Sequence, residues 1–192
     1  MTGGLAGGWK ADYLPWRERF EPFFSGLEST EVFVLSWGPG KYSSGFSKRE
    51  SIVADLATRA GNHVATPEQI IEQDTRFKGY TTLEAEEIQA AEADVIICLI
   101  VDNPKAGGAP TELSIFERNP AVQPKIRCLL PIKELKGLLY EAAHQIPGER
   151  SFRYTPTQFQ RCDDIRAKCH QWVEAVRRHK HLSRWKETKS TN

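Results

Sequence analysis

A strongly apolar run in the middle of the chain constrains the fold more than any other feature. It extends from residue 93 to residue 101, is rich in β-branched side chains, and ends at Asp102. Apart from Asp94 near its start, its residues do not alternate between apolar and polar, as they would in a strand with one solvated face. We therefore expect a strand that helices cover on both sides, which is typical of a parallel sheet.

Four more strands and six helices fit around this run. Strands are predicted at 31–36, 62–66, 125–130 and 151–155, and helices at 13–27, 47–60, 82–91, 111–118, 132–143 and 157–180. Ser47 with Glu50 has the spacing of a capping box, and Gly61 would end that helix. Because strands and helices alternate, we predict a Rossmann-like (flavodoxin-like) three-layer α/β fold with a five-stranded parallel sheet.

The chain has 192 residues, which suits one domain with a full core. We expect a flexible leader at 1–12, the domain at 13–180 and a basic tail at 181–192. The N-terminus lacks the pattern of a signal peptide, and no stretch has the length and apolarity of a membrane helix. The four cysteines include no CxxC pair, which favours a reducing cytoplasm and gives no metal-ligand cluster.

The net charge of +1 gives little support for nucleic-acid binding, which requires many cations to neutralise phosphates. Basic residues nevertheless gather after Arg161. We interpret this segment as a solvated helix end, with contact to nucleic acid or to an acidic partner as the alternative.

Ligands of open parallel sheets bind beyond the carboxyl ends of the strands, so the loops there hold the candidate site. The loop after the first strand combines close backbone approach with positive charge, although an ordinary strand-to-helix turn is the alternative reading. Its candidate binding residues are Ser36, Trp37, Gly38, Gly40 and Lys41, with Arg49 adding charge from the helix that follows. Trp37 would stack on a base or pack locally.

The loops after the second and third strands contribute acidic candidates. Glu68 follows the second strand, and Asp102, Gly108 and Glu112 follow the third. Glu112 would enter the first turn of a helix and point into the cleft over the first and third strands. The alternative is that it only favours the helix N-terminus as an acidic residue there.

These residues resemble two families of nucleotide-processing proteins. The run from Ala93 to Asp102, followed by Gly108 and Glu112, resembles the nucleoside 2-deoxyribosyltransferase pattern, where a catalytic glutamate follows such a strand. It is also similar to TIR-like domains, in which a Glu-Leu pair opens a helix after a short loop. The resemblance covers residues 31–131. It implies that Glu112 is the catalytic carboxylate, that Asp102 binds sugar hydroxyls or orients the glutamate, and that residues 36–41 contact the ligand.

The implied activity is hydrolysis or transfer at the N-glycosidic bond of a nucleotide or NAD, in a setting such as bacterial antiphage defence. A carboxylate would stabilise the positive sugar or attack it. No cofactor or metal is implied, since NAD or the nucleotide is substrate or ligand. Leu113 and the Ala109-Pro110 pair depart from the two patterns. They favour an alternative, a sensor that binds a nucleotide without turnover. A homo-oligomer, an effector partner and a purely structural interaction domain remain further alternatives.

Overall fold

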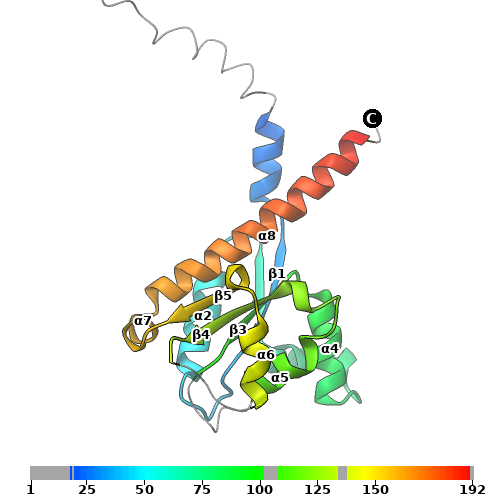
Figure 1. Cartoon of the computed structure of the whole chain (residues 1–192). Coiled ribbons are helices and arrows are strands. Elements are labelled where there is room, and N and C mark those ends of the chain that lie inside the picture. The colour runs from blue at the N-terminus through cyan, green and yellow to red at the C-terminus, as the bar shows by residue number, and fades with distance from the viewer. Residues whose placement is uncertain (1–17, 19, 102–107, 134–137, 191–192) are drawn as a thin grey trace, which may run out of the picture.

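The computed structural model describes residues 18, 20–101, 108–133 and 138–190, and it has the expected α/β architecture with one parallel sheet. The strand order is β2-β1-β3-β4-β5, and every neighbouring pair is parallel (Figure 1). The strands are β1 (Val32–Trp37), β2 (Asn62–Ala65), β3 (Val95–Leu99), β4 (Ile126–Pro131) and β5 (Ser151–Tyr154). The expected Rossmann-like, flavodoxin-like class is confirmed.

The central strand β3 is buried along its whole length, as its uninterrupted apolar sequence predicts. It pairs with β1 on one side and with β4 on the other. Parallel strands need long crossover connections, and each crossover here contains at least one helix.

Helices cover both faces of the sheet. A helix at residues 20–28 precedes β1. The others are α2 (Phe46–Ala57), α3 (Pro67–Gln73), α4 (Thr82–Glu92), α5 (Gly108–Phe116), α6 (Leu138–Gln145), α7 (Pro156–Arg161) and α8 (Asp163–Ser190). Short 3-10 turns lie at Thr75–Phe77, Gln123–Lys125 and Gly148–Arg150.

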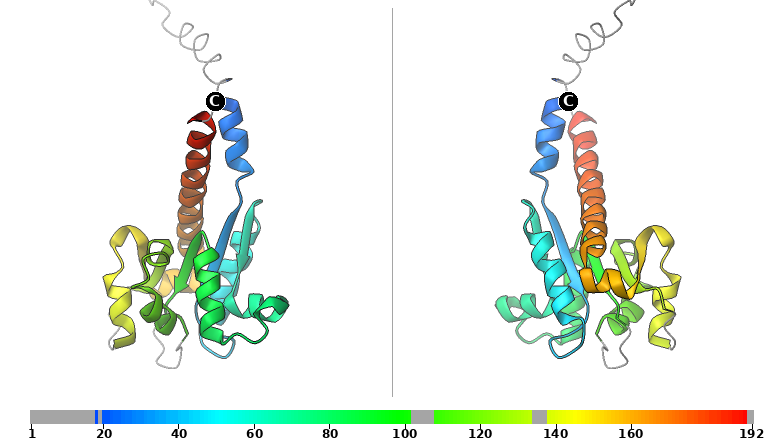
Figure 2. Two further views of the ribbon diagram at one scale, coloured as in Figure 1. Left: turned by 90° about the vertical axis from the view of Figure 1, so that its right-hand side faces the viewer. Right: turned by 90° about the vertical axis from the view of Figure 1, so that its left-hand side faces the viewer.

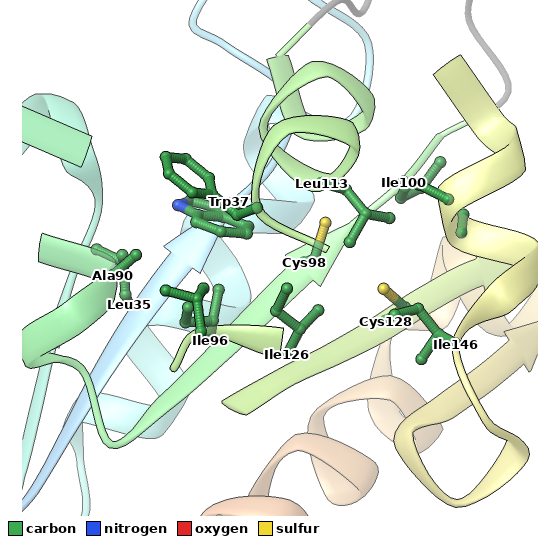
Figure 3. Close-up of a cluster of buried hydrophobic side chains, with 14 of the residues drawn as sticks. Leu35, Trp37, Ala90, Ile96, Cys98, Ile100, Leu113, Ile126, Cys128 and Ile146 are labelled. Carbon is green, nitrogen blue, oxygen red and sulfur yellow. The ribbon is translucent and has the colours of Figure 1, made fainter. Parts of the chain in front are cut away.

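Two apolar clusters separate the three layers. One lies between the sheet and the helices α4, α5 and α6, and contains Leu35, Trp37, Ala90, Ile96 and Leu113 (Figure 3). The other lies on the opposite face under α2 and α8. Successive residues of β3 alternate between the two clusters, which explains why this strand is apolar without interruption.

Three local expectations about helices are corrected. The helix after β1 begins at Phe46 with Gly45 as its N-cap, so the predicted Ser47–Glu50 capping box is not formed. The helix α3 was not predicted from the sequence. The long C-terminal helix is interrupted, because Cys162 adopts a left-handed conformation with φ of 69° between α7 and α8.

The C-terminal segment is part of the folded helix rather than a separate tail. The helix α8 continues without a break through residue 181 to Ser190. His181 is buried, and its ring lies 4.6 Å from that of Phe23 in the helix at residues 20–28. Both helices extend past the end of the sheet (Figure 2). The expected leader at 1–12 falls outside the described residues.

Within the described segments, no helix combines the length and the apolarity that crossing a bilayer requires.

Candidate functional site

The strand order reverses at β1 and β3, because β2 lies on one side of β1 while β3, β4 and β5 follow on the other. In open α/β sheets, ligands bind at this switch point, beyond the carboxyl ends of the strands. The loop after β1 and the start of α5 both lie at this edge. Gly108 is the first residue of α5, whereas Asp102 lies outside the described residues.

Glu112 lies in the second turn of α5, and the burial of its neighbours fixes its position. Leu113 and Phe116 anchor the helix in the core at 0% and 3% exposure. The Glu112 side chain is partly exposed as a whole, but its Oε2 atom is buried and has no hydrogen-bond partner among the described residues. A buried carboxyl oxygen without a partner costs free energy, and this cost identifies the residue as a candidate for function.

The environment of Glu112 raises the pKa of its carboxyl group from 4.5 to about 8. Desolvation by burial is the largest cause, and the carboxylates of Glu86 and Glu68 add to it. The Arg49 guanidinium acts in the opposite direction. These four side chains therefore lie within electrostatic range of one another and carry more negative than positive charge. Protonation of Glu112 relieves this imbalance.

Arg49 is the buried cation of the cluster. Its side chain reaches from α2 to Glu68, where its two terminal nitrogens form hydrogen bonds of 3.1 and 3.0 Å to the two carboxylate oxygens. It also donates to the carbonyl oxygen of Gly38 at 3.3 Å. A Cβ atom at residue 38 would lie 2.6 Å from the Arg49 Cδ atom. Gly38 therefore makes room for the arginine.

Glu68 is positioned by the first turn of α3. The Thr66 side chain accepts a hydrogen bond from the Gln69 backbone, and the Gln69 side chain accepts one from the Thr66 backbone. Pro67 occupies the first helical position. The Thr-Pro-Glu-Gln string is a capping-box signal, and it could have predicted this helix from the sequence.

Glu86 is the member of the cluster that the sequence analysis missed. It lies on α4 and is half-buried, and desolvation and the Glu68 carboxylate raise its pKa. A helix was predicted from the sequence at 82–91, but not which of its glutamates would face the site.

The remaining predicted binding residues fall into two groups. Ser36 and Trp37 are buried in β1 at 2% and 0% exposure, and Trp37 lies within the apolar cluster (Figure 3). Its ring stacks on Phe116 with a centroid distance of 5.4 Å. Of the two alternatives for Trp37, local packing is the one observed, and its assignment as a ligand-binding residue is corrected because its ring is enclosed in the core. Gly40 accepts two hydrogen bonds from Ser43 in the loop, and Lys41 is exposed.

Two of the basic side chains near this loop, Lys48 and Arg49, already have partners within the protein. Lys48 donates to the carbonyl oxygen of Gln160 near the end of α7, and Arg49 is paired with Glu68. A pocket of about 360 Å³ lies over the Arg49–Glu68 pair, and Lys41 and Tyr42 form part of its rim. Its volume falls in the range of roughly 300–1,000 Å³ that small-molecule sites occupy.

Across the described segments, no group of three or more histidine, cysteine or acidic side chains is arranged to hold a metal ion. The chemistry that the cluster offers is that of carboxyl groups. Glu112 can donate or accept a proton near neutral pH, and the net negative charge favours a cationic group on a ligand.

Comparison with models of known protein families gives no match. A search among curated proteins also gives no significant match. The resemblance to deoxyribosyltransferases and TIR-like domains therefore rests on the motif residues alone.

Proposed function

We propose that this protein cleaves or transfers the N-glycosidic bond of a nucleotide or dinucleotide, with Glu112 as its catalytic carboxylate. The observation that carries the proposal is the buried Oε2 atom of Glu112, which has no partner in the described structure and lies at the switch point of a parallel sheet. Glu112 is partly exposed as a whole residue, and the proposal requires a ligand to reach its carboxyl group from that exposed side.

The excess of negative charge around Glu112 supports a substrate whose leaving group is cationic. The nicotinamide of NAD has this property, because its ring nitrogen carries a positive charge while it is bonded to ribose. A cation near Glu112 lowers the pKa of the carboxyl group, so binding favours the ionised form. We therefore place NAD-like dinucleotides first among the candidate substrates.

In the hydrolytic reaction, the bond between ribose C1′ and the ring nitrogen breaks, and the electron pair leaves with the ring. Nicotinamide departs as a neutral molecule, and positive charge develops on the sugar. The Glu112 carboxylate stabilises this charge or forms a covalent glycosyl intermediate. Water adds its oxygen at C1′ and releases one proton, so that the products are nicotinamide, the sugar with a hydroxyl group at C1′, and a proton.

A nucleotide sensor is the second candidate, and the raised pKa of Glu112 favours it. With a pKa of about 8, the carboxyl group is mostly neutral at pH 7 and can donate a hydrogen bond to a ligand. A neutral carboxyl group suits recognition without cleavage. Turnover separates the two functions, because a sensor releases its ligand unchanged.

The test is incubation of the purified protein with NAD and with a panel of nucleosides and nucleotides, followed by chromatography of the released bases. We expect release by the wild-type protein and its loss in Glu112→Gln. Glu87→Gln serves as the matched control, because Glu87 is an exposed glutamate next to Glu86 on α4. Equal release by Glu112→Gln and wild-type protein would overturn the catalytic role.

A further inference from the structure

A second cavity, with a volume of about 260 Å³, lies at the same edge of the sheet but over different strands. Val101, which follows β3, and the last residues of β4 and β5, Pro131 and Tyr154, contribute to its wall. Neither Glu112 nor Arg49 is among the described residues that line it. The two sites therefore occupy opposite halves of the edge where ligands of such sheets bind.

Two aromatic side chains, Tyr154 and Phe159, form part of the wall of this cavity. Tyr154 is buried, and its hydroxyl group donates a hydrogen bond of 2.5 Å to the carbonyl oxygen of Ile100. The Tyr154 ring stacks on Phe159 of α7, with a centroid distance of 5.1 Å and an interplanar angle of 21°. Since the hydrogen bond and the stacking hold both rings in place, the wall is pre-formed.

The rim of the cavity differs from its wall. Ile132 is 58% exposed there, and Lys133 is the charged residue among the described lining side chains. An exposed isoleucine beside an aromatic hollow leaves apolar surface that a ligand could cover. The lysine adds a positive charge at the entrance.

We propose that this cavity binds a planar heteroaromatic ring that is linked to an anionic group, as the base of a nucleoside monophosphate is linked through ribose to its phosphate. The ring packs against the Tyr154–Phe159 wall, and the anionic group lies near Lys133. The volume is slightly below the roughly 300–1,000 Å³ of sites for drug-sized ligands, so the cavity suits one ring rather than a whole dinucleotide. This binding requires neither Glu112 nor cleavage of a bond, and it therefore goes beyond the proposed function.

Calorimetric titration of the full chain with adenosine monophosphate, adenine and ribose 5-phosphate tests the proposal. We expect the nucleotide to bind, adenine to bind more weakly, and ribose 5-phosphate not to bind. Ile132→Trp should weaken binding of the nucleotide by about tenfold or more, because the indole occupies the mouth of the cavity. Leu182→Trp is the matched control, since Leu182 is also an exposed apolar residue but lies on the far part of α8.

Lys133→Ala tests the anionic group separately. It should weaken binding of adenosine monophosphate about fivefold and leave binding of adenine unchanged. Equal affinity of the Ile132→Trp variant and the wild-type protein for the nucleotide, or no binding of either adenine or the nucleotide, would overturn the proposal. Repeating the titration with Glu112→Gln separates this proposal from the proposed function. We expect that variant to retain binding at the cavity even if no base is released from any substrate.

Discussion

At the scale of single residues, the neighbours of Glu112 control its carboxyl group. Burial raises the pKa of this group most, the carboxylates of Glu86 and Glu68 raise it further, and the Arg49 guanidinium lowers it. The same protonation equilibrium affects both the chemistry and the stability of the protein. Substitution of each neighbour should therefore change the pKa of Glu112 by an amount that can be measured separately.

The first prediction concerns Glu86→Gln, which removes one of the negative charges that hold the pKa of Glu112 near 8. The pKa of Glu112 should fall toward its ordinary value. Carbon-13 NMR titration of the Glu112 carboxyl group measures this change. Glu87→Gln is the control and should leave the pKa unchanged. An identical pKa in both variants would show that Glu86 does not act on the site.

The second prediction concerns stability as a function of pH. The pKa of Glu112 is about 8 in the folded protein and ordinarily 4.5, so the folded state binds the proton more tightly. The free energy of unfolding should therefore fall as pH rises from about 5 to 8. Glu112→Gln has no carboxyl group to titrate at this position. Between about pH 5 and pH 8, its free energy of unfolding should therefore rise by about 1–4 kcal/mol relative to that of the wild-type protein. Urea denaturation of both proteins at about pH 5 and pH 8 measures this difference. The same change in the free energy of unfolding between these pH values in both proteins would contradict the prediction.

At the scale of secondary-structure elements, the start of α2 depends on a glycine. Gly45 has a φ of 100°, and a Cβ atom there would lie 2.8 Å from Val101 Cγ1 and 3.1 Å from Pro39 Cγ. This turn lies between the two sites. Ser44 lines the cavity at Tyr154 and Phe159, and Phe46 lines the pocket over Arg49.

The third prediction is that Gly45→Ala lowers the free energy of unfolding by about 1–3 kcal/mol, through backbone strain and the clash with Val101. Gly40→Ala is the matched control in the same loop, since a Cβ atom there meets nothing within 4 Å. It should leave stability unchanged or raise it by about 0.5 kcal/mol. Thermal denaturation compares the two, and equal losses would contradict this account of the turn.

At the scale of the whole molecule, α8 connects the C-terminal part of the chain to the first two strands through hydrogen bonds. Arg177 is fully buried, and it donates hydrogen bonds to the Thr30 carbonyl oxygen just before β1 and to the Asn62 side chain at the start of β2. It also contacts Glu174 at 3.2 Å. One side chain thus joins three segments that are far apart in the sequence.

The fourth prediction is that Arg177→Met lowers the free energy of unfolding by about 2–4 kcal/mol, because the buried acceptors lose their donor. Arg178→Met is the control, since Arg178 is the exposed neighbour on the same helix and should change stability by less than about 0.5 kcal/mol. Chemical denaturation measures both variants. Similar losses in the two would contradict a specific role for Arg177.

The strands β1, β3 and β4 could be predicted because each is a short apolar run bounded by glycine, proline or acidic residues, whereas the more polar β2 and β5 were predicted with the help of the proline that follows each of them. The candidate position of Glu112 follows from the same alternation, since α5 comes directly after β3. Other features depend on contacts between elements and leave no local pattern. Arg177 and Arg178 look alike in the sequence, yet one is buried and the other exposed. In the same way, the side of α4 that faces the site decides between Glu86 and Glu87.

The catalytic role of Glu112 is tested by measuring bound NAD and free nicotinamide in the same sample, for wild-type protein and for Glu112→Gln. We expect the wild-type protein to release nicotinamide, whereas the variant binds NAD and leaves it intact. If both proteins bind NAD and neither releases nicotinamide, the claim of cleavage is contradicted and the site functions as a sensor.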